Sequence, residues 1–382
     1  MATFDSLQMT RQLVSYDTVS RDSNLPLIEF TENWLVDNGI DSFRISSDDG
    51  TKSNLVASIG PAEADGIILS GHTDVVPVDG QPWSADPFAP WVDEGRLYGR
   101  GTCDMKGFIA VALAAVPRMT NLKRPIHLAL SYDEEVGCKG APRMIDAIRR
   151  KLPPCRAVVI GEPTCMQAVR AHKGIVALKT TVTGYETHSS QTHRGVSAVM
   201  TAARLVSYLD TMATTIAHQT HNDNGFEPPY TTVHVGIIRG GTAINIISRE
   251  CEFIWDIRAM PQDNPQSLID EFETFCRDEV LPELKRRHFA VAIDTQILAN
   301  APGFEVSADS YAVEMVQRLT GIKATQNVSY AAEAGQYQAA GLASVICGPG
   351  SIDQAHQPDE YLELSELQAA EHLIDEIIEM QS

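Results

Sequence analysis

The stretch Gly66-Ile67-Ile68-Leu69-Ser70-Gly71-His72-Thr73-Asp74 is an apolar run that ends in a histidine and a carboxylate. Its first half is short, aliphatic and preceded by glycine, which is typical of a buried β-strand. A histidine at such a strand end can bind a metal ion through one ring nitrogen while a carboxylate accepts from the other. An isolated His-x-Asp is more often an ordinary loop histidine. The role of His72 and Asp74 therefore depends on the residues further along the chain.

The composition excludes several classes of protein. A chain of 382 residues favours two domains, or one domain with a large insertion. No apolar segment approaches a membrane-spanning length. The excess of 50 acidic over 30 basic residues disfavours nucleic acid and anionic membranes as partners. Seven cysteines without a Cys-x-x-Cys pair, and an N-terminus unlike a signal peptide, predict a cytoplasmic protein with reduced thiols.

The N-terminal part of the chain alternates strand patterns with helix patterns. The strands expected here are Asn54–Ile59, Ile67–Ser70, Ile126–Ser131 and Ala157–Gly161, and the helices expected are two within Asp5–Gly39 and one at Phe108–Met119. This alternation predicts a mainly parallel, helix-covered sheet of the α/β class. Ligands of such sheets gather at the carboxyl ends of the strands.

The pattern changes from Ile175 onward. The expected order is strand, helix, strand, strand, helix, strand, at Val176–Thr183, Val196–Thr214, Thr231–Ile238, Ile244–Arg258, Ser267–Arg287 and Ala290–Leu298. The order βαββαβ predicts a ferredoxin-like α+β domain, in which two helices cover one face of a four-stranded antiparallel sheet. After it, a helix at Ser307–Leu319, a strand at Ala343–Cys347 and a helix from Ser365 restore the α/β pattern.

These patterns divide the chain into three segments. Residues 1–175 and 299–382 are expected to form one metal-binding α/β domain, and residues 176–298 a domain inserted within it. The inserted domain therefore interrupts the first domain in the sequence.

Five residues that can bind metal ions lie at or near strand ends, namely His72, Asp104, Glu135, Glu162 and His356. Two imidazoles and three carboxylates suit two zinc-like divalent ions held roughly 3.5–4 Å apart. Asp104 is the natural bridge, which leaves one histidine and one glutamate for each ion. The set therefore predicts a two-metal centre.

Each of these residues also has an ordinary interpretation when taken alone. Asp104 stands just before a helix, where a carboxylate can cap free N–H groups. Glu134-Glu135 is compatible with a solvated acidic loop, Glu162 with a turn before proline, and His356 with a surface loop. Two adjacent glutamates on extended backbone point in opposite directions, so only one should bind metal. The other is free to act as a general base on water, and residue reasoning leaves open which glutamate that is.

Four stretches carry a resemblance to a known family. They are Gly71-His72-Thr73-Asp74-Val75-Val76-Pro77, Gly99-Arg100-Gly101-Thr102-Cys103-Asp104-Met105-Lys106-Gly107, Asp133-Glu134-Glu135-Val136-Gly137 and Gly161-Glu162-Pro163-Thr164. In this order they resemble the motifs of the dinuclear zinc deacylases, and the match spans nearly the whole chain. The resemblance implies one zinc ion at His72 and Glu162, a second at Glu135 and His356, and a bridge at Asp104. Cobalt or manganese can occupy similar sites.

The resemblance also implies roles for residues that do not bind metal. Asp74 would orient His72, and Glu134 would be the general base. His188 would reach the active site of a neighbouring subunit and stabilise the oxyanion, which requires a homodimer formed through the inserted lid domain. Arg258 would bind a substrate carboxylate, and Asn245 would lie near the substrate. Without the resemblance, these last three are an ordinary loop histidine, a strand-end arginine and a turn amide.

The activity that the resemblance implies is hydrolysis of an N-acyl amino acid, a small-molecule substrate. The stretches Gly348–Tyr361 and Tyr330–Gly335 are most similar to the branch that converts N2-acetyl-L-ornithine to L-ornithine and acetate, as in arginine biosynthesis. On that interpretation Glu333, or its surroundings, faces the substrate's δ-ammonium group. The alternatives are desuccinylation of succinyl-diaminopimelate, broad deacylase or dipeptidase activity, and a catalytically silent ligand-binding protein.

Overall fold

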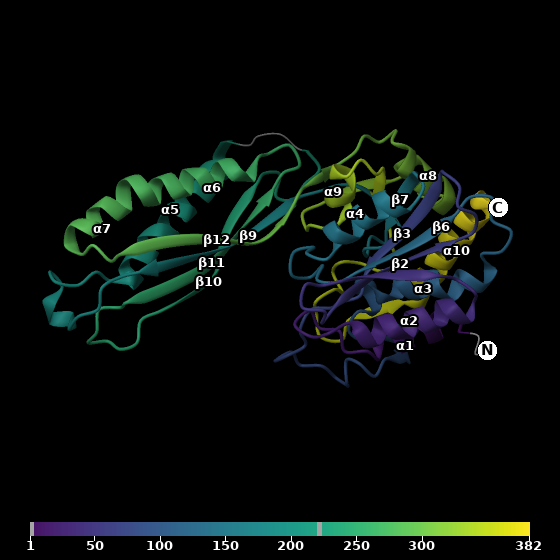
Figure 1. The fold of residues 1–382 in the computed structure, drawn as a ribbon, viewed down its shortest axis with the longest axis horizontal. Helices are drawn as coiled ribbons and strands as arrows, with labels where there is room; N and C mark the ends of the chain where they lie inside the picture. Colours follow the sequence, from purple (N-terminus) through teal and green to yellow (C-terminus); the bar gives the residue numbers. More distant parts are fainter. Residues whose placement is uncertain (1–3, 220–223) are drawn as a thin grey trace. The chain divides into compact units, whose positions relative to one another are not determined.

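The computed structural model describes residues 4–219 and 224–382 and divides the chain into two units (Figure 1). Unit 1 comprises Met1–Ala171, Phe304–Asn327 and Ala332–Ser382, and unit 2 comprises His172–Gly303 and Val328–Ala331. The main segment of unit 2 begins a few residues before, and ends a few residues after, the inserted domain expected at residues 176–298. The reason is local, because the first strand of unit 2 begins at Gly174 and its last strand runs to Ala301.

Unit 1 is built around one large twisted sheet. Its strands, in spatial order, are β1 (Ser42–Ser46), β2 (Ser53–Ile59), β6 (Ile126–Ser131), β3 (Gly66–His72), β7 (Cys155–Ile160), β15 (Ser344–Ile346), β8 (Ala168–His172) and β13 (Phe304–Glu305), with β14 (Thr325–Val328) paired to β8. The four central strands β6, β3, β7 and β15 are parallel, and the pairs β1–β2, β2–β6 and β15–β8 are antiparallel. The expected mainly parallel sheet is confirmed for this centre.

The register of the central strands places their carboxyl ends at one edge of the sheet. Ser70 of β3 lies opposite Ile160 of β7, and His72 lies opposite Ser131 of β6. Ile346 of β15 is likewise paired with Ile160. The loops that follow these four strands therefore start side by side.

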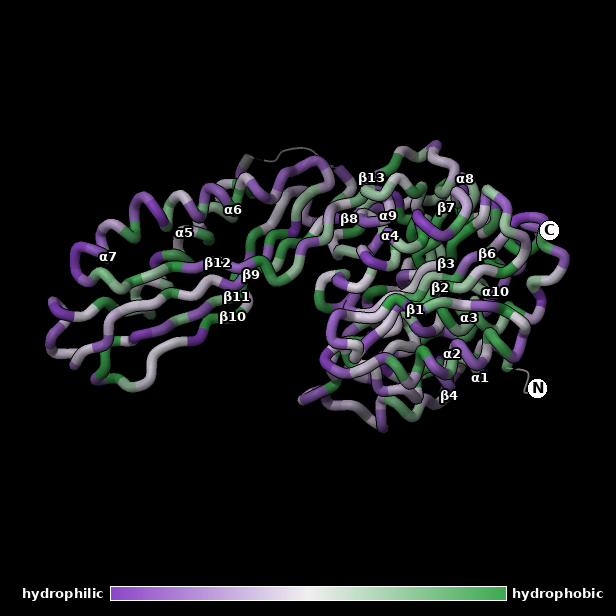
Figure 2. The backbone as a smooth tube through the Cα atoms, viewed as in Figure 1, coloured by the Kyte–Doolittle hydropathy of each residue, from purple (hydrophilic) through white to green (hydrophobic). Residues whose placement is uncertain are grey.

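Helices cover both faces of this sheet (Figure 1). One face shares its core with α1 (Ser6–Val14), α2 (Leu25–Asp37), α3 (Gly107–Ala115), α8 (Tyr311–Thr320) and α10 (Leu364–Gln381). Helices α4 (Ala141–Lys151) and α9 (Ala334–Ala339) contact the sheet outside that cluster. Figure 2 shows the hydrophobic colouring concentrated on the inner strands and on α3, in which every residue is buried.

Helix α3 lies close to the carboxyl end of β7 because a glycine stands there. A Cβ at Gly161 would lie 2.0 Å from the ring of Phe108, a distance that no side chain tolerates. Gly161 therefore permits the first turn of α3 to pack against the strand end that leads to Glu162.

A small antiparallel sheet completes unit 1. It consists of β4 (Trp91–Asp93), β5 (Arg96–Tyr98) and β16 (Tyr361–Glu363), in the order β16-β5-β4. The ring of Tyr98 stacks on that of Trp91 with centroids 5.1 Å apart. The sequence patterns did not indicate these short strands, because three residues are too few to display a period.

Unit 2 has the expected ferredoxin-like order. It consists of β9 (Gly174–Thr183), α5 (Ala198–Gln219), β10 (Thr232–Gly240), β11 (Glu250–Ala259), α6 (Pro265–Thr274), a π-helical segment at Phe275–Val280, α7 (Leu281–Arg287) and β12 (Ala292–Ala301). The sheet order is β10-β11-β9-β12, and every pair is antiparallel. The helices lie on one face (Figure 1), so β9 alternates strictly between buried and half-buried residues.

One expected strand of unit 2 was wrong at its beginning. The strand expected from Ile244 starts only at Glu250, and residues 241–249 form a loop. Gly241 opens this loop with φ of +78°, a conformation that glycine adopts without steric cost. Asn245 consequently lies in a loop and not in a strand.

Two expectations drawn from composition concern the whole chain. Among the helices in the part of the chain that the structure describes, none is both long and apolar enough to cross a bilayer. All seven cysteines lie in that part as well, and all are free thiols. Residues 1–3, which belong to the N-terminal stretch inspected for a signal peptide, lie outside the described residues.

Candidate metal centre

The loops after the four parallel strands of unit 1 supply a cluster of imidazoles and carboxylates. His72 is the last residue of β3, Glu135 lies in the turn after β6, and Glu162 follows β7. His356 comes from the loop after β15, and Asp104 from the segment that precedes α3. The structure brings all five together in unit 1.

The first group of candidate ligands is buried. His72 Nε2 lies 3.0 Å from Asp104 Oδ1 and 3.9 Å from Glu162 Oε2. Among the described residues, no hydrogen-bond partner faces Glu162 Oε1, although this atom is inaccessible to solvent. A buried carboxylate oxygen without a partner is costly, and a bound cation would remove that cost.

The second group opens to solvent. His356 Nε2 lies 3.3 Å from Asp104 Oδ2 and 3.0 Å from Glu135 Oε2. The His356 side chain is 49% exposed, whereas those of its two carboxylate partners are buried. This half of the cluster therefore forms its accessible side.

Asp104 belongs to both groups and uses a different oxygen in each. Within each group, one ligand atom from every residue lies within 4.8 Å of the others. The alternative role of Asp104 as a helix cap is not observed, because α3 has no side-chain cap at its N-terminus. The geometry and the donor set fit two divalent metal ions that share Asp104.

The electrostatics of the metal-free cluster point to the same conclusion. Burial lowers the pKa of His72, but the carboxylates of Asp104 and Glu162 raise it more, so that it lies well above its ordinary value. The same balance raises the pKa of His356 to about 11. Burial raises the pKa of Glu134 to about 8. The chain therefore holds protons on this cluster that divalent cations would displace.

Asp74 acts differently from the expectation. The carbonyl oxygen of Asp74, not its carboxylate, lies in hydrogen-bond range of His72 Nδ1, at 2.9 Å against 3.7 Å for Oδ1. The carboxylate instead accepts from Ser20 Oγ at 2.6 Å and from the backbone N–H groups of Glu134 and Glu135 at 3.1 and 3.3 Å. Asp74 therefore orients the imidazole through its backbone and holds the glutamate turn through its side chain.

The two adjacent glutamates lie in a turn and not on the extended backbone that was expected, but they differ in their contacts. Glu135 Oε2 lies 3.0 Å from His356 Nε2, whereas Glu134 belongs to neither group of candidate ligands. Glu134 Oε1 accepts a hydrogen bond from Cys138 Sγ at 3.2 Å. Glu134 is therefore the glutamate that lies outside both groups of candidate ligands.

Glu333 immediately precedes α9 and is 1% exposed. Neither carboxylate oxygen makes a well-formed hydrogen bond to the described residues, although the hydroxyls of Ser131 and Ser70 lie close enough to lower its pKa in part. Burial outweighs them and raises the pKa to about 7. Glu333 is thus a buried acid inside unit 1, and its charge raises the pKa of Glu134.

Unit 2 brings together two of its three candidate residues. His188 is bridged to Ile246, and Ser189 N donates to Asn245 O at 2.9 Å, so His188 and Asn245 lie in adjoining loops. Arg258 lies near the opposite end of β11, paired with Thr232 and Ile175. His188 and Asn245 are therefore separated from Arg258 within this unit.

Arg258 is half-buried on the sheet face that the helices leave open. Its Nε donates to Asp256 Oδ2 at 2.9 Å, two residues earlier on the same face. This bond orients the guanidinium plane and leaves the end-on pair of Nη atoms for a carboxylate.

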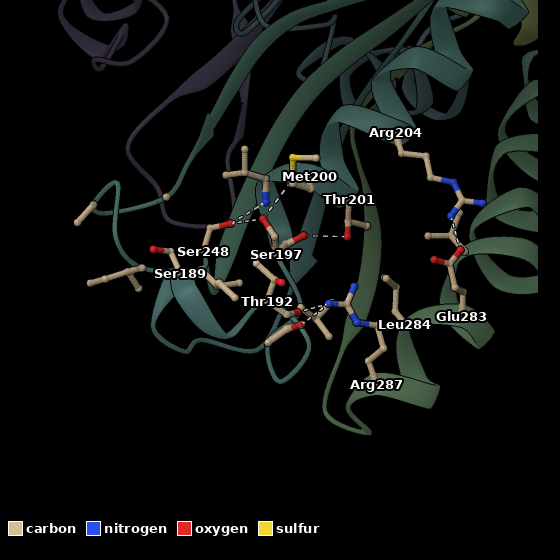
Figure 3. Close-up of a pocket in the computed structure, with 18 residues that line it drawn as sticks. Ser189, Thr192, Ser197, Met200, Thr201, Arg204, Ser248, Glu283, Leu284 and Arg287 are labelled. Atoms are coloured by element: carbon tan, nitrogen blue, oxygen red, sulfur yellow. Dashed lines mark hydrogen bonds and ion pairs between the residues drawn. The ribbon is translucent and has the colours of Figure 1, made fainter.

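A hollow of about 620 Å³ adjoins the His188 loop in unit 2 (Figure 3). Arg204 on its wall is paired with Glu283 at 2.7 Å, and Arg287 donates to the carbonyls of Thr192 and Gly195. Because these charged groups already have partners, apolar side chains determine what the hollow can accept, among them Val196, Met200, Ile246, Val280 and Leu284.

Sequence reasoning passed over two buried charged residues near the cluster. Arg100 and Glu360 are each 1% exposed and form an ion pair of 2.7 Å. The signal that could have found them is their position inside the stretches around Asp104 and His356, because a buried charge requires a partner.

The fold and the ligand set are those of a metal-dependent amidohydrolase. The model of the peptidase family M20/M25/M40 matches residues 68–380, and the chain belongs to this family. Acetylornithine deacetylase from Shigella sonnei (strain Ss046) is 34% identical over an alignment that covers 97% of this chain and 96% of that protein.

Solved structures share the fold at lower identity. The M20 family metallo-carboxypeptidase Sso-CP2 from Sulfolobus solfataricus has a TM-score of 0.78 at 17% identity, covering 99% of both chains. The di-peptidase Dug1p from Saccharomyces cerevisiae has a TM-score of 0.75 at 15% identity, covering 98% of this chain and 95% of its own.

The shared position of Asp104 generates a prediction for metal binding. We expect Asp104→Asn to weaken zinc binding by more than about 100-fold, beyond the ~10–100-fold typical of residues that only support ligands. The reason is that this one change removes a negative charge that both groups share. Dialysis against buffered zinc followed by elemental analysis measures the effect. Asp353→Asn is the matched control, because Asp353 is exposed in the His356 loop and lies outside both groups. Two tightly bound zinc ions in Asp104→Asn would contradict the assignment.

Proposed function

We propose that the chain hydrolyses N2-acetyl-L-ornithine to L-ornithine and acetate with two divalent metal ions, zinc being the first choice. The observation that carries the proposal is the sharing of Asp104 between two His/Glu pairs, with Glu134 beside them and outside both sets. The similarity to an acetylornithine deacetylase over nearly the full length of both chains supports the choice of substrate. Seven free thiols suit a reducing compartment, so the proposal includes a cytoplasmic location.

The residues of unit 1 would hold the two ions. His72 and Glu162 would hold one, Glu135 and His356 the other, and Asp104 would bridge them. When bound, such a pair supplies Lewis-acid polarisation of the acyl carbonyl and water acidic enough to lose a proton near neutral pH.

Glu134 would carry the proton in both halves of the reaction. It would accept a proton from the attacking water and later deliver it to the leaving amine nitrogen. A general base works best when its pKa lies near the working pH, and burial already moves the pKa of Glu134 upward into this range. The Asp74 carboxylate would keep Glu134 in place by accepting from its backbone N–H.

Three residues would select the substrate. The free Nη pair of Arg258 would bind the α-carboxylate, since a guanidinium fork matches a carboxylate bidentately. Asn245 would donate or accept near the acyl amide. Glu333 would face the δ-ammonium of ornithine, which would supply the partner that both of its oxygens lack.

His188 would stabilise the oxyanion of a second copy of the chain. Within unit 2, His188 lies at the end of the sheet opposite Gly174 and Ala301, where the chain enters and leaves the unit. We expect a residue at that end of the sheet to be available for contact with a second copy of the chain.

The same region offers an apolar surface for a second copy. Ile244 is 101% exposed and Met200 is 73% exposed, and both lie in segments that line the hollow of Figure 3. Strand β10 next to them is an edge strand. A twofold dimer would insert such apolar side chains into the partner's hollow and cover the edge.

The role of Glu134 is tested by its removal. We expect Glu134→Ala to keep both metal ions but to lose about three or more orders of magnitude in kcat. One acid–base group usually contributes ~10²–10⁴-fold, and the loss should reach the upper part of this range or exceed it because Glu134 would serve both proton transfers. Elemental analysis and steady-state rates on one sample measure this. Near-normal turnover in a metal-loaded preparation would refute the assignment.

The substrate is tested by comparing rates on acetylornithine, succinyl-diaminopimelate, acetylmethionine and a dipeptide, with metal analysis on the same sample. We expect acetylornithine to be hydrolysed fastest, and Glu333→Gln to lose most of the preference for it over acetylmethionine, because the charge opposite the δ-ammonium is removed.

A higher rate on another substrate would assign the chain to that activity. No amide hydrolysis by a metal-loaded sample would indicate a silent ligand-binding protein. An unchanged preference in Glu333→Gln would show that Glu333 does not contact the δ-ammonium.

The dimer is tested by complementation between two inactive variants. Co-expressed His188→Ala and Glu134→Ala chains should recover about a quarter of wild-type activity, because half of the randomly formed dimers are mixed and each mixed dimer has one intact site. Adding Ile244→Lys to both chains should abolish the recovery by preventing association. If the mixture stayed inactive while both chains formed mixed dimers, His188 would not act across an interface.

A further inference from the structure

The Glu360 carboxylate is the anchor of the loop that carries the shared metal ligand. Arg100 Nη1 donates to it at 2.7 Å, and the N–H of Gly101 lies 3.1 Å from both of its oxygens. The backbone N–H groups of Cys103 and Asp104 donate to Oε1 at 2.9 and 3.1 Å. Three backbone donors of one irregular loop therefore point to a single buried carboxylate.

The placement of Glu360 follows from the small sheet of unit 1. Tyr361 of β16 pairs with Tyr98 of β5, and Gly99 N donates to Glu360 O at 2.9 Å. The loop can curl around the carboxylate because Gly101 adopts φ of +84°, and a Cβ there would meet Val75 at 2.7 Å. The pairing of two three-residue strands thus sets where the loop before α3 begins.

Arg100 extends the same network to the second metal ligand. Its Nη2 donates to Gln81 Oε1 at 2.6 Å, and its guanidinium lies over the Trp83 ring at 5.0 Å. Gln81 Nε2 in turn donates to the carbonyl oxygen of His356 at 2.9 Å. His356 has φ of +64°, a left-handed conformation that a non-glycine residue keeps only when its surroundings hold it.

We propose that Glu360, Arg100 and Gln81 form a positioning network that sets Asp104 and His356 at the separation needed for the ion they share. The network touches the backbone of both ligand loops and neither ligand side chain, so it acts through position alone. This inference rests on the proposed metal centre. It adds that occupancy of the solvent-facing site, formed by Asp104, Glu135 and His356, depends on a buried ion pair outside the ligand set.

The sharpest test replaces the anchor by its uncharged isostere. In Glu360→Gln, one carboxylate oxygen becomes an NH₂ group, which must face either Arg100 or the backbone N–H groups of the loop. We expect the zinc affinity of the solvent-facing site to fall about 10–100-fold, the range typical of residues that orient metal ligands. Calorimetric titration with zinc measures both affinities, and cobalt absorption reports the coordination geometry.

Separate effects on kcat and KM distinguish a loss of metal positioning from a general disruption of the structure. With zinc limiting, kcat of Glu360→Gln on acetylornithine should fall, and excess zinc should restore it. KM should stay at the wild-type value, because no residue of the network is placed at the substrate. A kcat that excess zinc fails to restore in a folded variant would overturn the positioning role.

Glu363→Gln is the matched control. Glu363 lies on the same strand β16 and accepts from Arg96 Nε at 2.8 Å, but this cross-strand pair touches neither ligand loop. The same chemical change three residues away should leave both zinc affinities and kcat unchanged. An equal loss of zinc affinity in Glu363→Gln would show that the small sheet, and not the network, matters.

A second variant keeps the test decisive if Glu360→Gln fails to fold. Gln81→Met leaves the bonds of Glu360 to the loop intact and removes, at a partly exposed position, the arm to His356 and the acceptor of Arg100 Nη2 and Trp83 Nε1. We expect a smaller loss of zinc affinity at the same solvent-facing site. If the wild-type chain binds two ions and every folded variant binds zinc with unchanged affinity, the positioning role is wrong but the proposed metal centre stands. A wild-type chain that takes up fewer than two ions would overturn the proposed metal centre itself.

Discussion

The structure of unit 1 depends on one carboxylate that faces two imidazoles. Asp104 presents Oδ1 to His72 at 3.0 Å and Oδ2 to His356 at 3.3 Å, and each histidine has a further glutamate beside it. So many ionisable groups in a buried place are unstable without compensating positive charge. Protonated imidazoles supply part of that charge, because the carboxylates of Asp104 and Glu135 raise the pKa of His356 to about 11. A divalent cation in each group would provide the same compensation without protons, and this exchange couples metal binding to the stability of the loops.

Two further carboxylates support this centre without belonging to either ligand group. Asp74 accepts the backbone N–H groups of Glu134 and Glu135, and Glu360 accepts those of the loop that ends at Asp104. Irregular loops cannot satisfy their own N–H groups as helices and strands do, so an inward-facing carboxylate both satisfies them and fixes their direction. The metal-binding geometry therefore rests on backbone groups held by buried anions.

The two units contribute different chemistry. Unit 1 supplies the candidate metal ligands and the proposed acid–base residue, most of them from the carboxyl ends of adjacent parallel strands, where ligands of a doubly covered sheet gather. Unit 2 supplies candidate recognition residues from an antiparallel sheet whose helices cover one face only, so that Arg258 lies half-buried on the other face, paired with Asp256. His188 and Asn245 lie at the opposite end of that sheet from Arg258, and this separation suits residues that serve two different copies of the chain.

The sequence alone determined the elements whose periods are long enough to read, the βαββαβ order of the inserted unit, and the side chains able to bind metal. These properties are local, since a period or a ligand type is visible without knowing what lies opposite. Short strands such as β5 and β16, and the loop that contains Asn245, have no such period and were missed or misplaced. Only the tertiary structure decided that Asp104 faces both histidines, that the carbonyl of Asp74 orients His72, and that Glu134 stands outside both ligand groups. The physical reason is that these relations depend on side-chain directions and on residues far apart in the chain, and strand register and core packing set both.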